Sequence, residues 1–276
     1  MQLIALLLSS LLGFLSPIGF VVDRVAQNAI RSRFQKVEEL AVRVDNPPSQ
    51  QLIQGKVERV RIAGRGLWLT PDFRIAALEV ETDPLEVDIQ RLRQPSQNQQ
   101  QMPVESLRRP VQAGMRLVLN EDDLNKLLRS PAVIARMRNI SSRFLGTMGG
   151  QQEKAYELVN PNVEFLADNR LRFQVSIQEK MEAGSEQTNP RQLTLRVESG
   201  LGISSGNQVQ LVSPTAFIDD RPVHPFLLNP LVSKINERLD LRKLEPSGIT
   251  ARLLQLNLKP KQMEMAMFVR VEPKNK

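Results

Sequence analysis

Residues 56–89, KVERVRIAGRGLWLTPDFRIAALEVETDPLEVDI, decide the fold of this chain. Three runs within the stretch, at 59–62, 78–83 and 85–89, alternate apolar with charged or polar residues. Strict period-two alternation is typical of strands in a sheet with one apolar face and one solvated face. The stretch therefore predicts three short strands, whose apolar face must be covered by other parts of the chain.

A turn near Thr70-Pro71-Asp72 is expected to join the first two strands as an antiparallel hairpin. In that hairpin apolar residues should lie opposite apolar ones, and arginines opposite acids. A slip by one residue would spoil both faces, so the register should be well determined. The predicted cross-strand neighbours are Val60 with Val80, Ile62 with Leu78, Arg61 with Glu79, and Arg59 with Glu81.

The composition of the 276 residues limits the class of protein. Apolar residues make up 41% and aromatic residues only 4%, so the core should be aliphatic. The absence of cysteine excludes disulfides, thiolate metal ligands and a cysteine nucleophile. A net charge of +7 favours anionic partners, but one Trp and one Tyr are too few to stack the bases of a nucleic acid. Lipid or a membrane surface is therefore the expected partner, and nucleic acid is not.

Residues 1–22 form an apolar leader without a charged side chain. About 20 such residues can cross a bilayer as a helix. Three interpretations stay open: an uncleaved membrane anchor, a cleaved signal peptide and a buried helix. The leader has no basic residue at its start and no clear small-residue cleavage site, which favours the anchor. We therefore predict membrane association, with the cytoplasmic or periplasmic side left open.

The rest of the chain predicts a mixture of helices and strands. A glutamine-rich stretch at 94–110 has almost nothing to bury and is typical of a polar surface loop. Asn120 should cap a helix with acids in its first turn, and Ser130-Pro131 should start another. The other predicted elements are an amphipathic helix over 23–40, strands at 40–44, 111–119, 163–165, 171–177, 193–197 and 209–211, a helix opened by Asn229-Pro230, and a hairpin of 249–258 with 263–271.

Three blocks of sequence resemble a bacterial family of unknown-function domains related to the mycobacterial lipomannan elongation factor A, a phospholipid-binding protein. The blocks are GKVERVRIAGRGLWLTPDFRIAALEVETDPLEVDI at 55–89, LVLNEDDLNKLLRSPAV at 117–133 and LLQLNLKPKQMEMAM at 253–267. The resemblance runs from about Val37 to Val271 and carries no catalytic signature. It implies a tubular lipid-binding-like architecture, in which a long curved sheet wraps helices around an apolar groove. The glutamine-rich insertion and the leader without a basic start depart from the family pattern.

We therefore expect an α+β fold: a strongly curved antiparallel sheet that wraps helices around an elongated apolar groove. The leader occupies 1–22, and one domain occupies 23–273. The expected function is non-catalytic binding or transfer of phospholipid or another membrane lipid. Burial of an acyl chain can hold such a ligand without specific contacts, because each methylene removed from water contributes about 0.8 kcal/mol to binding. The alternatives are a membrane-anchored structural or assembly protein with a fully packed core, and a hydrolase.

The candidate site residues lie on the apolar stripes of the predicted helices and of the last strand. One histidine, His224, is more typical of a turn than of a general base, and no nucleophile motif accompanies it. One histidine and no cysteine leave only carboxylates for a metal, so no metal, cofactor or catalytic residue is expected. Arg65 lacks an evident acidic partner and is the head-group candidate. The groove candidates are Phe34, Leu124, Leu127, Val133, Met137, Ile140, Leu231, Ile235, Met265 and Met267.

Overall fold

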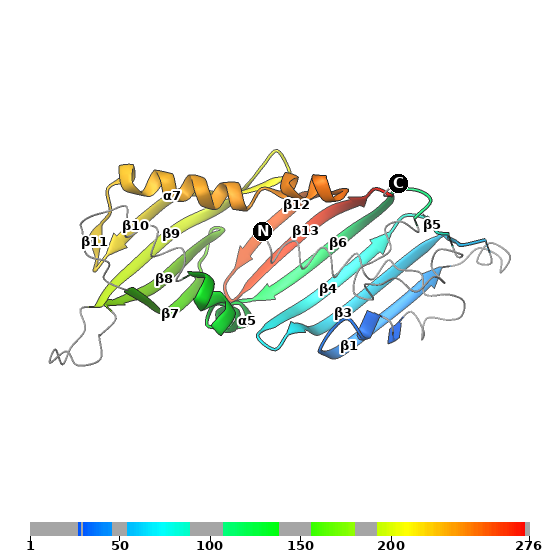
Figure 1. The fold of residues 1–276 in the computed structure, drawn as a ribbon, viewed down its shortest axis with the longest axis horizontal. Helices are drawn as coiled ribbons and strands as arrows, with labels where there is room; N and C mark the ends of the chain where they lie inside the picture. The colour runs from blue at the N-terminus through cyan, green and yellow to red at the C-terminus, as the bar shows by residue number, and fades with distance from the viewer. Residues whose placement is uncertain are drawn as a thin grey trace.

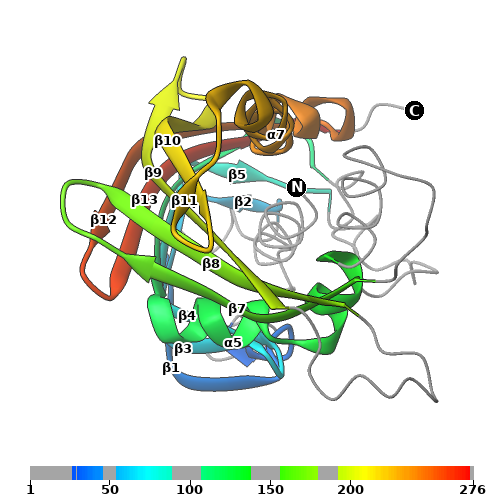
Figure 2. The same cartoon turned by 90° about the vertical axis from the view of Figure 1, so that its left-hand side faces the viewer.

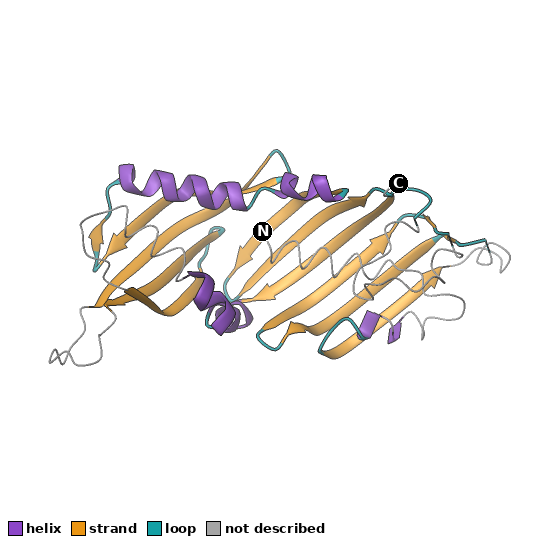
Figure 3. Ribbon diagram, viewed as in Figure 1, coloured by secondary structure: helices purple, strands orange, loops and turns teal. Residues whose placement is uncertain are grey.

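The protein is elongated and consists of two antiparallel sheets that follow one another along its long axis (Figure 1). The computed structural model describes residues 27–28, 30–45, 54–88, 107–137, 156–179 and 192–273. Strands dominate these residues, and short helices lie along the rims of the sheets (Figure 3). The predicted leader and most of the glutamine-rich stretch lie outside the described residues.

The first sheet has six strands in the order β1-β3-β4-β6-β13-β12. β3 and β4 form one hairpin and β12 and β13 another, and β6 carries the chain from the middle of the sheet into α5. A separate two-stranded ladder pairs β2 (Lys56–Val57) with β5 (Leu85–Glu86). The strands of the first sheet are β1 (Lys36–Asp45), β3 (Arg59–Thr70), β4 (Phe73–Thr82), β6 (Val111–Asn120), β12 (Ile249–Lys259) and β13 (Gln262–Val271).

The second sheet has five strands in the order β11-β10-β9-β8-β7. These are β7 (Tyr156–Phe165), β8 (Arg170–Glu179), β9 (Gln192–Ser204), β10 (Gln208–Ile218) and β11 (Arg221–Pro222). The helices are α5 (Glu121–Leu128), α7 (Pro225–Arg238) and the 3-10 helix η3 (Leu241–Ser247), and residues 27–28, 30–31 and 131–137 are also helical. Seen along the long axis, the strands form one curved wall, with α7 and α5 at opposite rims (Figure 2).

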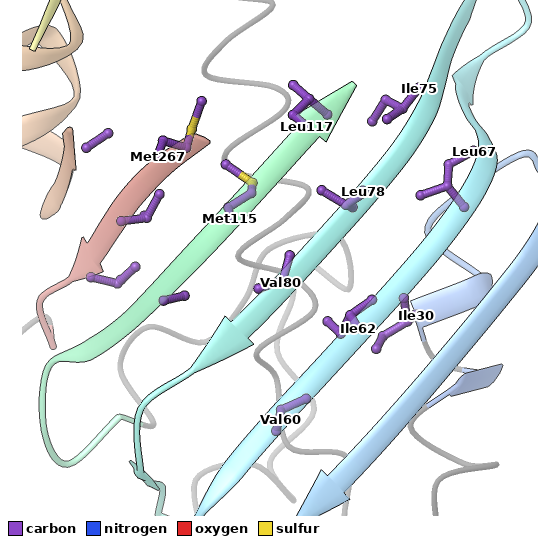
Figure 4. Packing of buried hydrophobic residues seen from close by; sticks show 14 of the residues in the cluster. Ile30, Val60, Ile62, Leu67, Ile75, Leu78, Val80, Met115, Leu117 and Met267 are labelled. Carbon is purple, nitrogen blue, oxygen red and sulfur yellow. The ribbon is translucent and has the colours of Figure 1, made fainter. Parts of the chain in front are cut away.

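Most of the apolar face of the first sheet is buried. Ile62, Leu78 and Met115 come from three adjacent strands and are no more than 6% exposed (Figure 4). The same cluster includes Ile30 and Phe34, which precede β1. The predicted alternation of this region is therefore confirmed, and the opposite face carries the charged residues.

The predicted register of the β3–β4 hairpin is wrong by two residues. Ile62 lies opposite Val80, and Arg61 lies opposite Glu81. Thr70 pairs directly with Phe73, so the turn occupies Pro71-Asp72 as expected, and only the pairing of the two strands is shifted. A shift of two residues keeps every side chain on its face, which is why hydrophobic patterning could not detect it.

In three neighbouring strands the alternation of buried and exposed residues shifts by one position, and the three shifts lie side by side in the sheet. In β3 the shift lies between Gly64 and Leu67, and the paired segments of β1 and β4 shift at the same place. Gly66 makes this possible, because its φ of 56° lies in the left-handed region that glycine tolerates. As a result Leu67 and Ile75, which lie opposite each other beyond the line, are fully buried.

Two predicted helices have other boundaries in the structure. The helix expected over 23–40 is wrong in its second half, because Lys36–Asp45 forms strand β1 and pairs with β3. The helix expected to open at Asn229-Pro230 begins earlier, at Pro225. His224 caps it, since its side chain accepts a hydrogen bond from the Phe226 amide at 3.3 Å. The predicted hairpin of β12 and β13 is confirmed.

Candidate apolar binding surface

The apolar face of the second sheet is only partly covered. Its central row places Val197 of β9 between Phe173 of β8 and Ala216 of β10. Val197 and Phe173 are half-buried and Ala216 is buried, whereas Ile62, Leu78 and Met115, which form the centre of the first sheet, are all buried. Other half-buried apolar residues on the same face of these strands are Ile177, Leu193, Leu195, Leu201 and Leu211.

Both sheets turn their apolar faces to the same side of the molecule. Leu201, Ile203 and Val209 of the second sheet pack against the buried cluster of the first sheet. Leu124 and Met263 also contact both buried clusters and fill the junction between the sheets. The second sheet therefore extends the buried apolar face of the first as a half-covered surface.

Helix α7 lies along the β10 edge of this surface and is held at its carboxyl end. The Asn236 side chain accepts a hydrogen bond from the Leu211 amide at 2.9 Å, and the Leu239 carbonyl accepts one from Val209 at 3.3 Å. Leu231 and Ile235 on this helix are half-buried. Side chains from the helix and from the sheet together therefore border the half-covered surface.

Helix α5 ties the two sheets together at the opposite rim. The Asn125 side chain pairs with the backbone of Val163 in β7, accepting from its N–H at 2.7 Å and donating to its carbonyl at 2.8 Å. Glu121 accepts from the Phe165 amide at 2.6 Å and from Lys261 Nζ at 2.6 Å. The hydrogen bond to Glu121 raises the pKa of Lys261 above its ordinary value.

Asp123 connects the same helix to the first sheet. It binds Arg74 of β4 at 2.9 Å, and Arg74 also binds Glu38 of β1 at 3.1 Å. Burial by itself lowers the pKa of Arg74, but hydrogen bonds to the two carboxylates outweigh it and the pKa is raised. The acids predicted to complement the helix dipole thus have a second role, because Glu121 and Asp123 are buried.

The opposite face of the first sheet holds an open hollow of about 620 Å³. Small residues, among them Ala41, Ala63 and Gly114, form part of its lining. Its arginines are neutralised: Arg61 pairs with Glu81, and Arg116 pairs with Glu79. The hollow is a shallow, solvent-facing depression on the charged face, and its arginines offer no unpaired charge to a lipid head group.

The structure places the predicted groove residues in different surroundings. Phe34, Leu127 and Met267 are buried in the core, and Leu124, Val133 and Met265 are half-buried and pack against it. Leu231 and Ile235 border the half-covered surface, Met137 is half-buried in the helical segment 131–137, and Ile140 lies outside the described residues. Arg65 is brought together with none of them. It lies on the polar face, 77% exposed, with Glu39 at 3.9 Å.

Sequence reasoning missed the apolar residues of the second sheet as site candidates. It predicted the strands that carry Phe173, Leu195 and Val197, and their alternation gave the correct apolar face. The missing information was how much of that face other segments cover. Only an unusual density of long aliphatic residues in three neighbouring strands could have drawn attention to it.

The described residues contain no cluster of three or more side chains that could hold a metal ion. Within the same ranges no helix is long and apolar enough to cross a membrane. His224 is exposed and is engaged as the cap of α7. The site described above is therefore an apolar surface with polar groups at its rims.

The architecture places the chain among α+β proteins built on curved antiparallel sheets with helices at the rims. Residues 14–267 match the model of the LmeA-like phospholipid-binding family. The match covers nearly the whole chain, including the end of the apolar leader, and the protein belongs to this family. Comparisons with curated proteins and with solved structures give no significant match.

Proposed function

We propose that this protein binds the acyl chains of a phospholipid, or of another membrane lipid, against the half-covered face of the second sheet beside α7. The observation that carries the proposal is the contrast between the sheets. Apolar side chains such as Ile62 and Leu78 are buried in the first sheet, and those such as Leu195 and Val197 are half-buried in the second. An acyl chain would gain about 0.8 kcal/mol for each methylene that it buries there. Membership of a phospholipid-binding family supports the same ligand class.

The proposed action is binding or transfer, with no bond made or broken. The only histidine of the chain, His224, is engaged in capping α7. The hydroxyl of Ser199, which is fully buried in the second sheet, shares its single proton between the carbonyls of Gly200 at 2.8 Å and Val212 at 3.1 Å. Neither group is arranged as part of a nucleophile–base pair.

The test compares two valine-to-tryptophan variants on central strands. Val197→Trp should fill the half-covered surface, so the variant should carry less lipid and keep a free energy of unfolding close to that of the parent. Val80→Trp is the matched control, because Val80 is 5% exposed in the packed first sheet. There the extra volume should cost about 1–3 kcal/mol through overpacking. Native mass spectrometry measures bound lipid, and the denaturant midpoint of delipidated protein measures stability.

Two results would reject the proposal in favour of a fully packed structural protein. In the first, the parent protein purified from its host carries no lipid. In the second, Val197→Trp destabilises the delipidated protein as much as Val80→Trp does. Delipidated protein is required because bound ligand stabilises the folded state by mass action and would mask the comparison.

A further inference from the structure

We propose that the end of the protein formed by the β10–β11 hairpin and the start of α7 docks on a lipid bilayer. This inference rests on the proposed function and names the surface through which a lipid would enter. Phe226, the second residue of α7, is 77% exposed, and Ile218 at the end of β10 is 39% exposed. Figures 1 and 2 show that both elements lie at the tip of the elongated molecule, far from β1.

The local backbone holds Phe226 in an exposed position. Pro225 fixes the first position of the helix, and His224 caps the Phe226 amide at 3.3 Å. The Val223 amide donates to the Ala216 carbonyl at 2.8 Å, which ties this segment to β10. An aromatic side chain on an ordered tip loses little conformational entropy when it enters a bilayer interface.

The charges of the tip are balanced, because Asp219 and Asp220 offset Arg196 and Arg221. Asp219 accepts a hydrogen bond from the Thr194 amide at 2.8 Å, and Asp220 pairs with Arg196 at 3.0 Å, so both acids are engaged within the protein. Arg221 is exposed and forms no ion pair within the described part of the chain. An exposed aromatic residue beside a free basic residue is typical of segments that bind membrane interfaces.

The tip is also continuous with the proposed lipid site. Helix α7 runs from Phe226 to Leu231 and Ile235, which border the half-covered surface. Ile218 lies on β10 in the same cross-strand row as Leu195 of that surface. A lipid leaving the bilayer at this end would therefore meet the side chains of Ile218 and Leu195 first. A protein partner would instead need a contact of about 800 Å² per side, and a tip with two exposed apolar residues favours insertion over such a contact.

The docking test places a fluorescent label on the tip itself. The chain has no cysteine, so a single introduced thiol can be labelled specifically. Full-length Phe226→Cys and Leu254→Cys are labelled with an environment-sensitive fluorophore and mixed with phosphatidylcholine–phosphatidylglycerol vesicles. Leu254 is the matched control, since it is 67% exposed on β12 away from the tip. The label at 226 should brighten and be quenched by spin-labelled lipid, and the label at 254 should do neither. The leader is present in both proteins, so it cannot cause the difference.

An unchanged signal at 226, or equal quenching at both positions, would overturn the docking proposal. So would brightening at 226 that grows with protein concentration in the absence of vesicles, because a second copy of the chain would then cover the tip. Phe226→Ser should slow lipid uptake from vesicles about tenfold, the effect of losing one buried aromatic side chain, and Leu254→Ser should not. Uptake by Phe226→Ser at the parental rate would also reject docking. If the parent takes up no lipid, the proposed function fails, and the quenching result still decides docking independently.

Discussion

Asn125 shows how one buried side chain can hold two sheets together. It lies on α5 and is 8% exposed, and its amide satisfies both the N–H and the carbonyl of Val163 in β7. β7 is the edge strand of the second sheet, and the Asn125 side chain makes the hydrogen bonds that a further strand would make there. Buried backbone groups that lose such a partner cost much more than the hydrogen bonds themselves contribute.

Asn125→Ala should lower the free energy of unfolding by about 2–4 kcal/mol, because two buried backbone groups of Val163 lose their partner. Lys126→Ala is the control, since Lys126 is the exposed neighbour on the same helix and should change stability by less than about 0.5 kcal/mol. Denaturant unfolding of both variants measures the difference. A loss below about 1 kcal/mol for Asn125→Ala would mean that water replaces the amide and that the junction does not depend on it.

At the scale of an element, β3 keeps its apolar residues on one face only because it contains Gly66. The φ of Gly66 is 56°, and a Cβ atom built on this residue would lie 2.0 Å from a carboxylate oxygen of Glu38. Glu38 is in turn bound to Arg74, which connects to α5 through Asp123. Backbone conformation in β3 is therefore coupled to the polar contacts at the junction of the sheets.

Gly66→Ala and Gly114→Ala should change stability in opposite directions. Gly66→Ala should destabilise the protein by about 1–2 kcal/mol, because alanine is strained in the left-handed region, and the displaced Glu38 adds to this loss. A Cβ atom on Gly114 of β6 meets nothing within 4 Å. Gly114→Ala should therefore stabilise the protein by about 0.4–1 kcal/mol, because alanine lowers the conformational entropy of the unfolded chain. Thermal unfolding measures both changes in stability. If both variants were stabilised, or both destabilised, local backbone strain would not decide the outcome at Gly66.

At the scale of the whole molecule, the two sheets differ in how their apolar faces are covered. The first sheet contributes most of the main buried cluster, which also receives Leu241 and Leu244 from η3. The second cluster is small and consists of Val163, Phe165 and Leu258. Because apolar burial is the main source of stability, the two halves of the elongated fold should differ in their resistance to local opening.

Native-state hydrogen exchange should reveal this difference. In delipidated protein the amides of β8, β9 and β10 should exchange faster than those of β4, β6 and β13, since regions with fewer buried apolar contacts open at lower free energy. Adding lipid should slow exchange in the second sheet selectively, because ligand binding stabilises the part of the protein that it contacts. Equal protection of both sheets, or equal slowing by lipid, would contradict the location that we propose for the lipid.

Much of the fold could be predicted from periodicity. The alternation around Ile62 and Leu78 gave the correct buried face, and the acids after Asn120 marked the start of α5. The register of the β3–β4 hairpin could not be obtained in this way, because a shift of two residues leaves both faces unchanged. The strand predicted at 40–44 is confirmed as part of β1, but residues 36–39 were misassigned to a helix, because their apolar spacing fits a helix as well, and pairing with β3 decided in favour of a strand.

The sequence by itself determined the class of the protein: curved, mostly antiparallel sheet, an aliphatic core, and a family pattern that includes Asp123-Leu124-Asn125. Only the tertiary structure decided which apolar face is left half-covered, and that the acids of α5 are buried between two sheets. Periodicity in one strand shows which of its faces is apolar. Periodicity contains no information about which distant segments of the chain pack on that face. The extent to which those segments cover the face distinguishes a closed core from a surface that can bind lipid.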